Sequence, residues 1–390
     1  MANENKKTVN LNIISIIVTI ALFIWFTFRT GLIGTFHWHR DIFMYYLILL
    51  VTAVLPVIFG VIFLLKRNKV SRLLVKIFSI FSLSLWIIIY LGLTVLGAMP
   101  ANAKNIPLLT QKDTLPLSHN KDNQDLYAHY AFASDPHWGS SNSDSQARIN
   151  IMNNIENNDY DAFFCLGDIS DVGMIPSIYK EAVHDISDCI KKTPVMILPG
   201  NHDGIVNGMP AFKKTFMKRG DKMYYRMDNG PVHIIVLFML WDDAEFSKRQ
   251  EKWLIRQLED IPEKDTVIIL SHCYILGSGY WDEAAHKNWG DIPSVVKRLT
   301  PILEKYHVDL HLSGHDHFFE DLEKDGVNYF VLGSMGGKLD TDLIYNSPYS
   351  KWLNNTDFGY VDLKIYNKQI ILTVYTQYGD PIYSKEIETR

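Results

Sequence analysis

Histidine, aspartate and asparagine recur in five short clusters along the second part of the sequence. Each cluster follows a run of apolar residues, and three of them contain a glycine that permits a tight turn. Any one of them alone is typical of a polar loop, since short motifs match by chance. The five clusters are Asp135-Pro136-His137, Gly167-Asp168-Ile169-Ser170-Asp171, Gly200-Asn201-His202-Asp203, Ser271-His272 and Gly314-His315-Asp316-His317.

These residue types are the ligands that borderline divalent metal ions accept, and the absence of cysteine argues against a structural zinc site. The candidates are too many for one tetrahedral ion but suit two ions that share a bridging carboxylate. Two ions about 3.5 to 4 Å apart form a clamp for phosphoryl chemistry. The sequence therefore predicts two divalent metal ions, with Mn, Fe and Zn equally suited. The candidate ligands are Asp135, His137, Asp168, Asn201, His272, His315 and His317.

The elements that must position these residues alternate in the manner of an α/β domain. Strand-like apolar runs begin at residues 126, 161, 195, 232, 266 and 328, and helical patterns lie near 145–157, 176–191, 246–260 and 292–306. Ligands of open α/β sheets bind outside the carboxyl ends of the strands, so we expect the five clusters to converge. A hairpin turning at Asn367 and Lys368 is expected to add antiparallel strands.

In this order, the motifs D-x-H, G-D-x-x-D, G-N-H-D, S-H and G-H-x-H resemble the five blocks of the calcineurin-like metallophosphoesterases, over residues 127–377. The resemblance implies two packed β-sheets flanked by helices. It also implies that Asp168 bridges two ions, the first held by Asp135, His137 and His317. The second ion would be held by Asn201, His272 and His315.

The same resemblance gives roles to residues that hold no metal. His202 would meet the leaving oxygen of the substrate, as general acid or as a stabilising cation, and Asp171 would orient it. Asp203 and Asp316 fit equally as hydrogen-bond partners or as solvated carboxylates. His311, in an apolar run, is expected to be a strand residue with a local hydrogen bond.

The chain departs from some branches of the family. Purple acid phosphatases carry a tyrosine where this chain has Asp171, so a charge-transfer colour is not expected. Protein Ser/Thr phosphatases continue with arginine and glycine where this chain has Val172-Gly173, which disfavours a phosphoprotein substrate. The ILPGNHD stretch is more similar to the cyclic-nucleotide phosphodiesterase and purple-acid-like branches.

Three uncharged apolar runs, at 11–28, 42–65 and 77–97, are each long enough to span a bilayer. Basic residues precede the first run and crowd the loop between the second and third, which places that loop inside and everything after residue 97 outside. We therefore expect a membrane domain at 1–100, a linker at 101–125 and the phosphoesterase domain at 126–390. Ala101 and Ala103 form a weak A-x-A pattern, for which a flexible linker is favoured over signal-peptidase cleavage.

The charge and the cysteines weigh against other classes of protein. A formal net charge of −5 without a long basic run does not favour a nucleic-acid partner. Three cysteines, Cys165, Cys189 and Cys273, without C-x-x-C spacing indicate neither a disulfide framework nor a zinc knuckle.

Taken together, these features predict a membrane-anchored phosphoesterase whose catalytic domain is extracytoplasmic. The resemblance implies hydrolysis of phosphomonoester or phosphodiester bonds by attack of a metal-bridging hydroxide. The anchor motivates a lipid-linked phosphate or cell-envelope phosphodiester as substrate, with membrane lipids as partners, and extracellular nucleotides are the second substrate class. The alternative is a non-catalytic sensing or binding module on the same fold. The segments 273–291 and 331–340 are expected to line the substrate pocket. Within the first, Tyr274, Tyr280, Trp281 and Trp289 are candidates for stacking or for a lipid-facing rim, and simple packing within the loop is the alternative.

Overall fold

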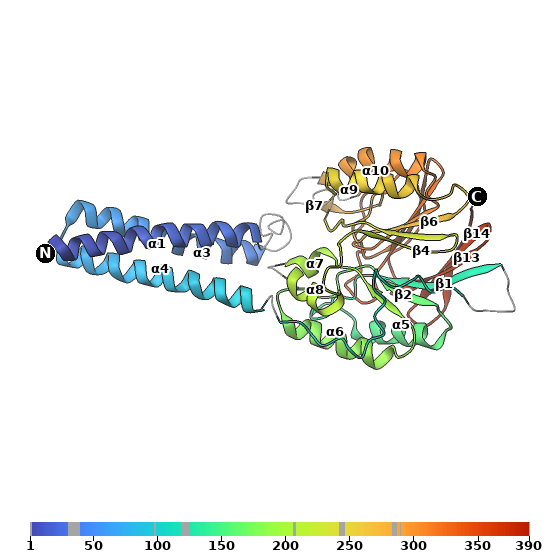
Figure 1. Cartoon of the computed structure of the whole chain (residues 1–390), viewed down its shortest axis with the longest axis horizontal. Helices are drawn as coiled ribbons and strands as arrows, with labels where there is room; N and C mark the ends of the chain where they lie inside the picture. The colour runs from blue at the N-terminus through green and yellow to red at the C-terminus, as the bar shows by residue number, and fades with distance from the viewer. Residues whose placement is uncertain are drawn as a thin grey trace. The chain divides into compact units, whose positions relative to one another are not determined.

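The computed structural model describes residues 2–29, 40–96, 99–118, 125–205, 208–241, 246–282, 287–288 and 290–389. The chain divides into two compact units, which are described separately (Figure 1). The first contains Met1–Met99 and Gly204–Pro210, and the second contains Pro100–Asp203 and Ala211–Arg390.

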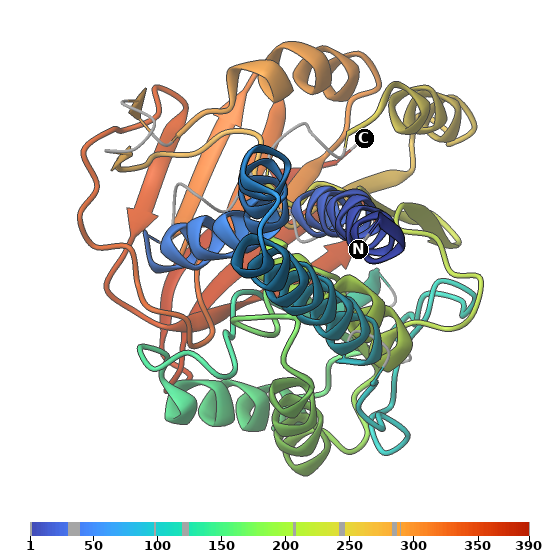
Figure 2. The ribbon, with the colours of Figure 1, turned by 90° about the vertical axis from the view of Figure 1, so that its left-hand side faces the viewer.

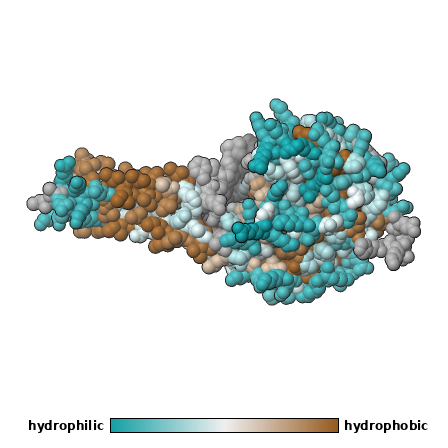
Figure 3. Space-filling view, viewed as in Figure 1, coloured by the Kyte–Doolittle hydropathy of each residue, from teal (hydrophilic) through white to brown (hydrophobic). Residues whose placement is uncertain are grey.

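The first unit is built from three long helices, α1 (Ala2–Arg29), α3 (Arg40–Lys66) and α4 (Lys69–Leu96), which pack side by side (Figure 2). The stretches Asn3–Thr27, Leu47–Lys66 and Lys69–Val95 are long and apolar enough to cross a membrane. Their outer faces carry exposed isoleucine, leucine and valine, and apolar side chains cover the middle of the helices (Figure 3). An apolar exterior is what contact with lipid tails requires. The three predicted apolar helices are therefore present.

Polar side chains are buried between these three helices, around a proline inside α3. Pro56 has no N–H, so the carbonyl of Thr52 loses its donor within the helix. The Ser82 hydroxyl of α4 donates to that carbonyl instead, at 2.7 Å. Asn12 of α1 donates to the Pro56 carbonyl at 2.8 Å and to the Ser79 hydroxyl at 3.0 Å. We call this set the polar seam: Asn12, Ser15, Thr52, Pro56, Ser79 and Ser82.

The second unit contains two mixed sheets with helices on their outer faces. The six-stranded sheet has the order β15-β14-β13-β1-β2-β3, and the seven-stranded sheet has the order β12-β10-β11-β9-β6-β5-β4. The first sheet comprises β1 (Leu126–Ala133), β2 (Ala162–Cys165), β3 (Val195–Ile197), β13 (Gly359–Tyr366), β14 (Gln369–Thr376) and β15 (Pro381–Glu388). The second comprises β4 (Tyr225–Asn229), β5 (Val232–Val236), β6 (Thr266–Leu270), β9 (Leu310–Ser313), β10 (Phe319–Lys324), β11 (Val327–Leu332) and β12 (Ser350–Asn354).

The helices cover the two sheets from opposite sides (Figures 1 and 2). α5 (Ser145–Asn157) and α6 (Pro176–Cys189) lie on one side, and α9 (Lys248–Glu259) and α10 (Pro293–Lys305) lie on the other. The short helices α7 (Asn201–Gly204) and α8 (Met209–Phe216) follow β3, and a two-stranded ribbon joins β7 (Trp281–Asp282) to β8 (Lys287–Asn288). The predicted class of two packed sheets flanked by helices is confirmed.

The main core lies between the two sheets, where the alternating apolar side chains of each strand meet. Phe132 and Phe164 of the first sheet share one buried cluster with Ile268 and Leu312 of the second. A second cluster joins the outer face of the seven-stranded sheet to the leucines of α9 and α10. Burial on both faces explains why β5 and β6 are mostly apolar, with one polar residue each, rather than alternating.

The described part of the predicted linker, 101–118, packs onto the second unit instead of lying free in solvent. Leu109 N–H donates to the Val195 carbonyl at 2.8 Å, and Val195 N–H donates to the Pro107 carbonyl at 2.9 Å, which extends the edge at β3. Ala101 and Ala103 are also buried. Their burial favours the uncleaved reading of the A-x-A pattern, because a protease needs an accessible, extended chain.

Candidate metal centre

The five sequence clusters meet at the carboxyl ends of β1, β2, β3, β6 and β9. Four of the site residues have left-handed backbone there: Asp135 (φ 57°), His137 (φ 47°), Asp168 (φ 52°) and His315 (φ 76°). This conformation is costly for residues with a side chain and is found where the surrounding structure imposes it. The chain leaves each strand in a sharp turn, which returns the side chain over the edge of the sheet.

Asp135, His137 and His317 form one group of potential ligands, with one atom from each lying within 4.8 Å of the others. His317 Nε2 is 3.4 Å and His137 Nε2 is 3.8 Å from Asp135 Oδ1. The other ring nitrogen of each histidine is held from behind: His317 Nδ1 bonds the Lys338 carbonyl at 2.6 Å, and His137 Nδ1 lies 3.3 Å from Asp171 Oδ1. Such support fixes the ring orientation, as in known metal sites.

The second group surrounds the side-chain oxygen of Asn201. His272 Nε2 and His315 Nδ1 approach Asn201 Oδ1 at 2.8 and 2.9 Å. His272 Nδ1 donates to the Leu166 carbonyl at 2.8 Å, which leaves Nε2 directed into the cluster. Asp168, His272 and His315 again have ligand atoms within 4.8 Å of one another.

Asp168 lies between the two groups, with one carboxylate oxygen toward each. Its Oδ2 is 3.4 Å from His137 Nε2, and its Oδ1 is 3.5 Å from His272 Nε2. A carboxylate in this position can bridge two ions.

The buried polar atoms of the cluster fit a pair of cations. Asp135 Oδ1 and His137 Nε2 are fully buried and make no hydrogen bond with the described part of the chain. Orphaned polar atoms of this kind are rare inside proteins, because each costs about 1–3 kcal/mol. A metal ion would satisfy both atoms at once.

The electrostatics favour the protonation state of a metal ligand at some of these groups and oppose it at others. Burial alone would raise the pKa of Asp135, but the neighbouring imidazoles of His137, His317 and His272 hold it well below its usual range. Burial lowers the pKa of His315 to about 3, so its imidazole is neutral at neutral pH. For His272, burial lowers the pKa but the Asp168 carboxylate raises it to about 9, an imidazolium that occupies the place of a cation. Metal binding displaces that proton.

His202 is held beside the cluster by its neighbours. Its backbone N–H donates to Asp168 Oδ1 at 2.8 Å, and its Nδ1 donates to the Asp171 carbonyl oxygen at 2.8 Å. The Asp171 carboxylate lies 3.7 Å from the same nitrogen. Asp171 therefore touches both His202 and His137.

The structure separates the alternatives left open for two acidic residues. Asp203 is buried and accepts backbone N–H groups of Ile169, Ser170 and Gly200 at 2.9–3.2 Å, so it ties the second cluster to the third. Asp316 is also buried, close to Tyr274 and Gly277. Neither is a solvated surface carboxylate.

The aromatic predictions have mixed outcomes. Tyr274 is fully buried, with its ring centroid 5.9 Å from that of His315, so it packs against a candidate ligand and cannot be part of a lipid-facing rim. Tyr280 is half-buried. The Trp281 side chain and Trp289 lie outside the described residues.

Trp241 was missed in the sequence, whereas the glycine-bearing segment 331–340 was expected near the site. The Trp241 ring stands edge-on to His315 at 6.0 Å. In the loop after β11, the Ser334 hydroxyl donates to the Asp135 carbonyl at 2.9 Å, and a side chain at Gly337 would collide with His137 and His317. The run Gly333-Ser334-Met335-Gly336-Gly337 was the available signal for this close approach.

Residues 128–319 match the family model described as calcineurin-like phosphoesterase. The chain is 26% identical to the tartrate-resistant acid phosphatase type 5 of Oryctolagus cuniculus, over 54% of this chain and 73% of that protein. It is 29% identical to the 3′,5′-cyclic adenosine monophosphate phosphodiesterase of Escherichia coli, over 35% of this chain and 47% of that protein. The purple acid phosphatase of yellow lupin seeds has a similar fold, with a TM-score of 0.57 and 18% identity, over 67% of this chain and 53% of that one. The chain thus spans about half the length of the last two.

A two-sheet sandwich with buried histidines and carboxylates at its strand ends fits a metal-dependent hydrolase of phosphoric esters. The family model and these relatives place residues 128–319, the matched part of the chain, among the calcineurin-like metallophosphoesterases. The relatives fall in the acid-phosphatase and cyclic-nucleotide phosphodiesterase branches that the ILPGNHD stretch favoured.

Proposed function

We propose that the protein is a membrane-anchored phosphoesterase that hydrolyses phosphomonoester or phosphodiester bonds at the outer face of the membrane. The observation that carries this proposal is the convergence of seven carboxylate, amide and imidazole side chains around buried, unsatisfied ligand atoms. The acid phosphatase and phosphodiesterase relatives support the same chemistry.

In this proposal Asp135, His137 and His317 hold the first ion, Asn201, His272 and His315 hold the second, and Asp168 bridges them. When bound, two divalent ions supply Lewis acidity toward the phosphoryl oxygens and lower the pKa of water.

The chain's own part in turnover falls to His202. Because Nδ1 is engaged by the Asp171 carbonyl, Nε2 is the atom left to meet the leaving oxygen. Asp171 fixes the ring in that direction and steadies His137 as well. We infer that protonated His202 stabilises or protonates the leaving alkoxide.

The distribution of basic residues supports the outward orientation. Lys66, Arg67, Lys69, Arg72 and Lys76 lie between the second and third apolar helices or at their ends, which the positive-inside rule assigns to the cytoplasm. The phosphoesterase domain then lies outside, where lipid-linked phosphates, envelope phosphodiesters and extracellular nucleotides are the candidate substrates. We place its start near residue 126, with 101–118 packed onto it.

The experiment is a measurement of metal content and of nitrophenyl phosphate ester hydrolysis by the full-length chain in nanodiscs, loaded with Mn, Fe or Zn in turn. His202→Ala should keep both metals and lose at least about 10²-fold in turnover, since general acid catalysis contributes that much. Asp168→Asn should lose metal and activity together. Two bound metals without turnover of any monoester, diester or lipid phosphate would favour the non-catalytic sensing module instead.

A further inference from the structure

Five cations crowd a ten-residue stretch of the second unit. They lie at the end of α8 and in the turn after it, and all five are exposed. Asp221 is the only acidic residue between 213 and 222, and its side chain accepts the Lys218 backbone N–H at 2.8 Å. The stretch therefore carries a net charge of +4 in a chain whose total is −5. We call this set the basic cluster: Lys213, Lys214, Lys218, Arg219 and Lys222.

We propose that the basic cluster docks on the anionic lipid headgroups of the membrane that the chain's own helices cross. The proposal rests on the three apolar helices spanning that membrane, and it is independent of ester hydrolysis.

Chain connectivity supports this location. Ala101 lies five residues after Leu96, the last residue of α4, and its backbone N–H donates to the Thr215 hydroxyl of α8 at 3.0 Å. An extended chain covers at most about 3.6 Å per residue, so Ala101 is within about 18 Å of the end of α4. Thr215 follows Lys213 and Lys214 directly. The cluster cannot be far from the bilayer surface at which α4 ends.

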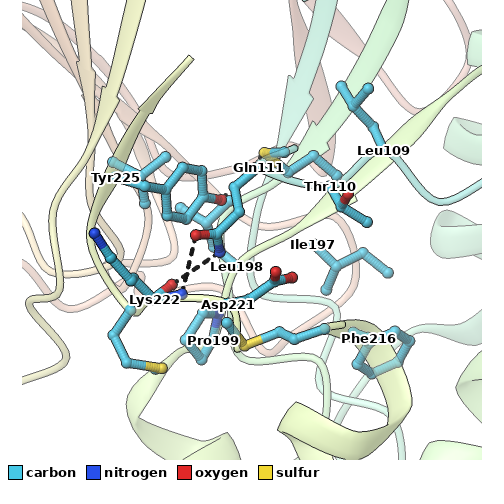
Figure 4. A pocket seen from close by; sticks show the side chains of 14 residues that line it. Leu109, Thr110, Gln111, Ile197, Leu198, Pro199, Phe216, Asp221, Lys222 and Tyr225 are labelled. Atoms are coloured by element: carbon cyan, nitrogen blue, oxygen red, sulfur yellow. Dashed lines mark hydrogen bonds between the residues drawn. The ribbon is translucent and has the colours of Figure 1, made fainter. Parts of the chain in front are cut away.

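A second pair of bonds ties the other end of the cluster to the same segment. Gln111 accepts the Lys222 backbone N–H at 2.9 Å and donates to the Lys222 carbonyl at 3.1 Å (Figure 4). Beneath this pair, Leu109, Phe216 and Tyr225 close a small pocket (Figure 4). The segment that follows α4 in the sequence therefore holds the basic cluster at both ends.

The surface beside the cluster is shaped for an amphiphile. A cavity of about 460 Å³ lies between residues 100–104 and the end of α8. Ala101, Ala103, Phe216 and Met217 give it apolar walls, and Lys104, Lys214 and Lys218 add cations. Lysine ammonium groups attract phosphate headgroups, while apolar walls accept the glycerol and upper acyl carbons.

The test is hydrogen exchange of full-length protein in nanodiscs of phosphatidylcholine, with and without phosphatidylglycerol, in the absence of substrate. Amides of residues 211–222 should exchange at least about fivefold more slowly in the anionic nanodiscs, and about 0.5 M NaCl should abolish the difference by screening. The triple variant Lys213→Glu, Lys214→Glu, Lys218→Glu should show no difference between the two lipids.

The matched control carries the same change of charge on α9, at Lys248→Glu, Arg249→Glu and Lys252→Glu, which are exposed but remote in sequence from α4. It should retain the full effect of phosphatidylglycerol. Both triple variants should keep the melting temperature and the hydrolysis rate on a soluble nitrophenyl ester, which shows that they fold. Equal exchange in the two lipids, or slowing that survives in the basic-cluster variant, would overturn the proposal, whether or not the enzyme turns over.

Discussion

The polar seam of the membrane helices and the metal centre of the sandwich both bury polar side chains. They differ in whether the buried polar atoms have hydrogen-bond partners. In the seam, donors meet acceptors: the Ser82 hydroxyl serves the Thr52 carbonyl, and the Asn12 amide serves the Pro56 carbonyl. In the metal centre, two buried ligand atoms, Asp135 Oδ1 and His137 Nε2, have no hydrogen bond among the described residues. A paired set stabilises a fold, whereas an unpaired, convergent set is arranged for a ligand.

The backbone shows the same contrast. The seam stays helical through Pro56, and neighbouring side chains repair the lost hydrogen bond. The metal centre holds four non-glycine residues in the left-handed region, at about 1–3 kcal/mol each. No described residue of the polar seam is in that region, so in this comparison the strain accompanies the positioning of ligands.

The largest expected effect comes from removing a charge at the unpaired site. Asp135→Asn should lower ester turnover by about 10³-fold or more, because one preorganised charge is lost from the cluster. The loss is measured as the rate of ester hydrolysis and as the amount of metal bound per chain. Asp362→Asn is the matched control: Asp362 is buried and accepts from His129 and Tyr160, but it belongs to no ligand group. If the two variants lose equal activity, the distinction between paired and unpaired carboxylates fails.

The next prediction divides the metal centre itself. His317→Ala should weaken the ion shared with Asp135 and His137, whereas His315→Ala should weaken the ion shared with His272 and Asn201, because the two rings point to different groups. Titration of each apoprotein with Mn²⁺ should show one tight and one weakened site in both variants. Identical loss of both ions in each variant would contradict the assignment.

A smaller effect is expected in the seam. Asn12→Leu removes hydrogen bonds to two other helices, and interhelical bonds in membranes contribute about 1–2 kcal/mol at most. Unfolding of the full chain in mixed detergent micelles measures the loss. Ile13→Leu, on the exposed face of the same turn, should be neutral. If Asn12→Leu is as stable as Ile13→Leu, the hydrogen bonds of the polar seam do not contribute to the stability of the helices.

The smallest effect concerns a buried histidine that is paired. His311 in β9 lies 2.8 Å from the Ser271 hydroxyl through Nε2, as the sequence had indicated, and burial lowers its pKa to about 3. Between pH 3 and its unfolded value near 6.5, the unfolded chain binds the extra proton, so stability falls as pH falls. The slope is about 1.4 kcal/mol per pH unit from this group.

His311→Gln keeps a hydrogen-bonding side chain at this position but removes the group that binds a proton in the unfolded chain. Its apoprotein should therefore lose less stability than the wild type between pH 6.5 and 5.5, by about 1 kcal/mol in denaturant unfolding. Parallel pH curves for the two proteins would show that His311 is already protonated in the fold.

Much of this arrangement could be predicted because it depends on local patterns. The helix at 145–157 was placed to the residue, since Asp144 caps it by accepting the Ala147 N–H. The hairpin at Asn367 and Lys368 joins β13 to β14 as expected. The five clusters were found because each follows an apolar run, and parallel strands carry their carboxyl ends to one edge.

What escaped prediction depends on contacts between distant segments. Strand β4 reads YRMDN, which is too polar and short to show a strand pattern, and it forms because β5 offers it an edge. The segment 101–118 has no periodicity, yet Leu115 is buried in the main core. Trp241 reaches the site only through the tertiary fold, for which a single sequence has no signal.

Pro56 has a consequence for the order in which the chain enters the membrane. The partner of the Pro56 carbonyl, Asn12, is made earlier in synthesis, but the partner of the Thr52 carbonyl, Ser82, is made later. Until α4 arrives, α3 would expose one unsatisfied carbonyl to lipid, which costs several kcal/mol. We expect nascent chains ending after α3 to stay beside the translocation channel, and Pro56→Ala to release them sooner, as site-specific crosslinking to the channel would detect.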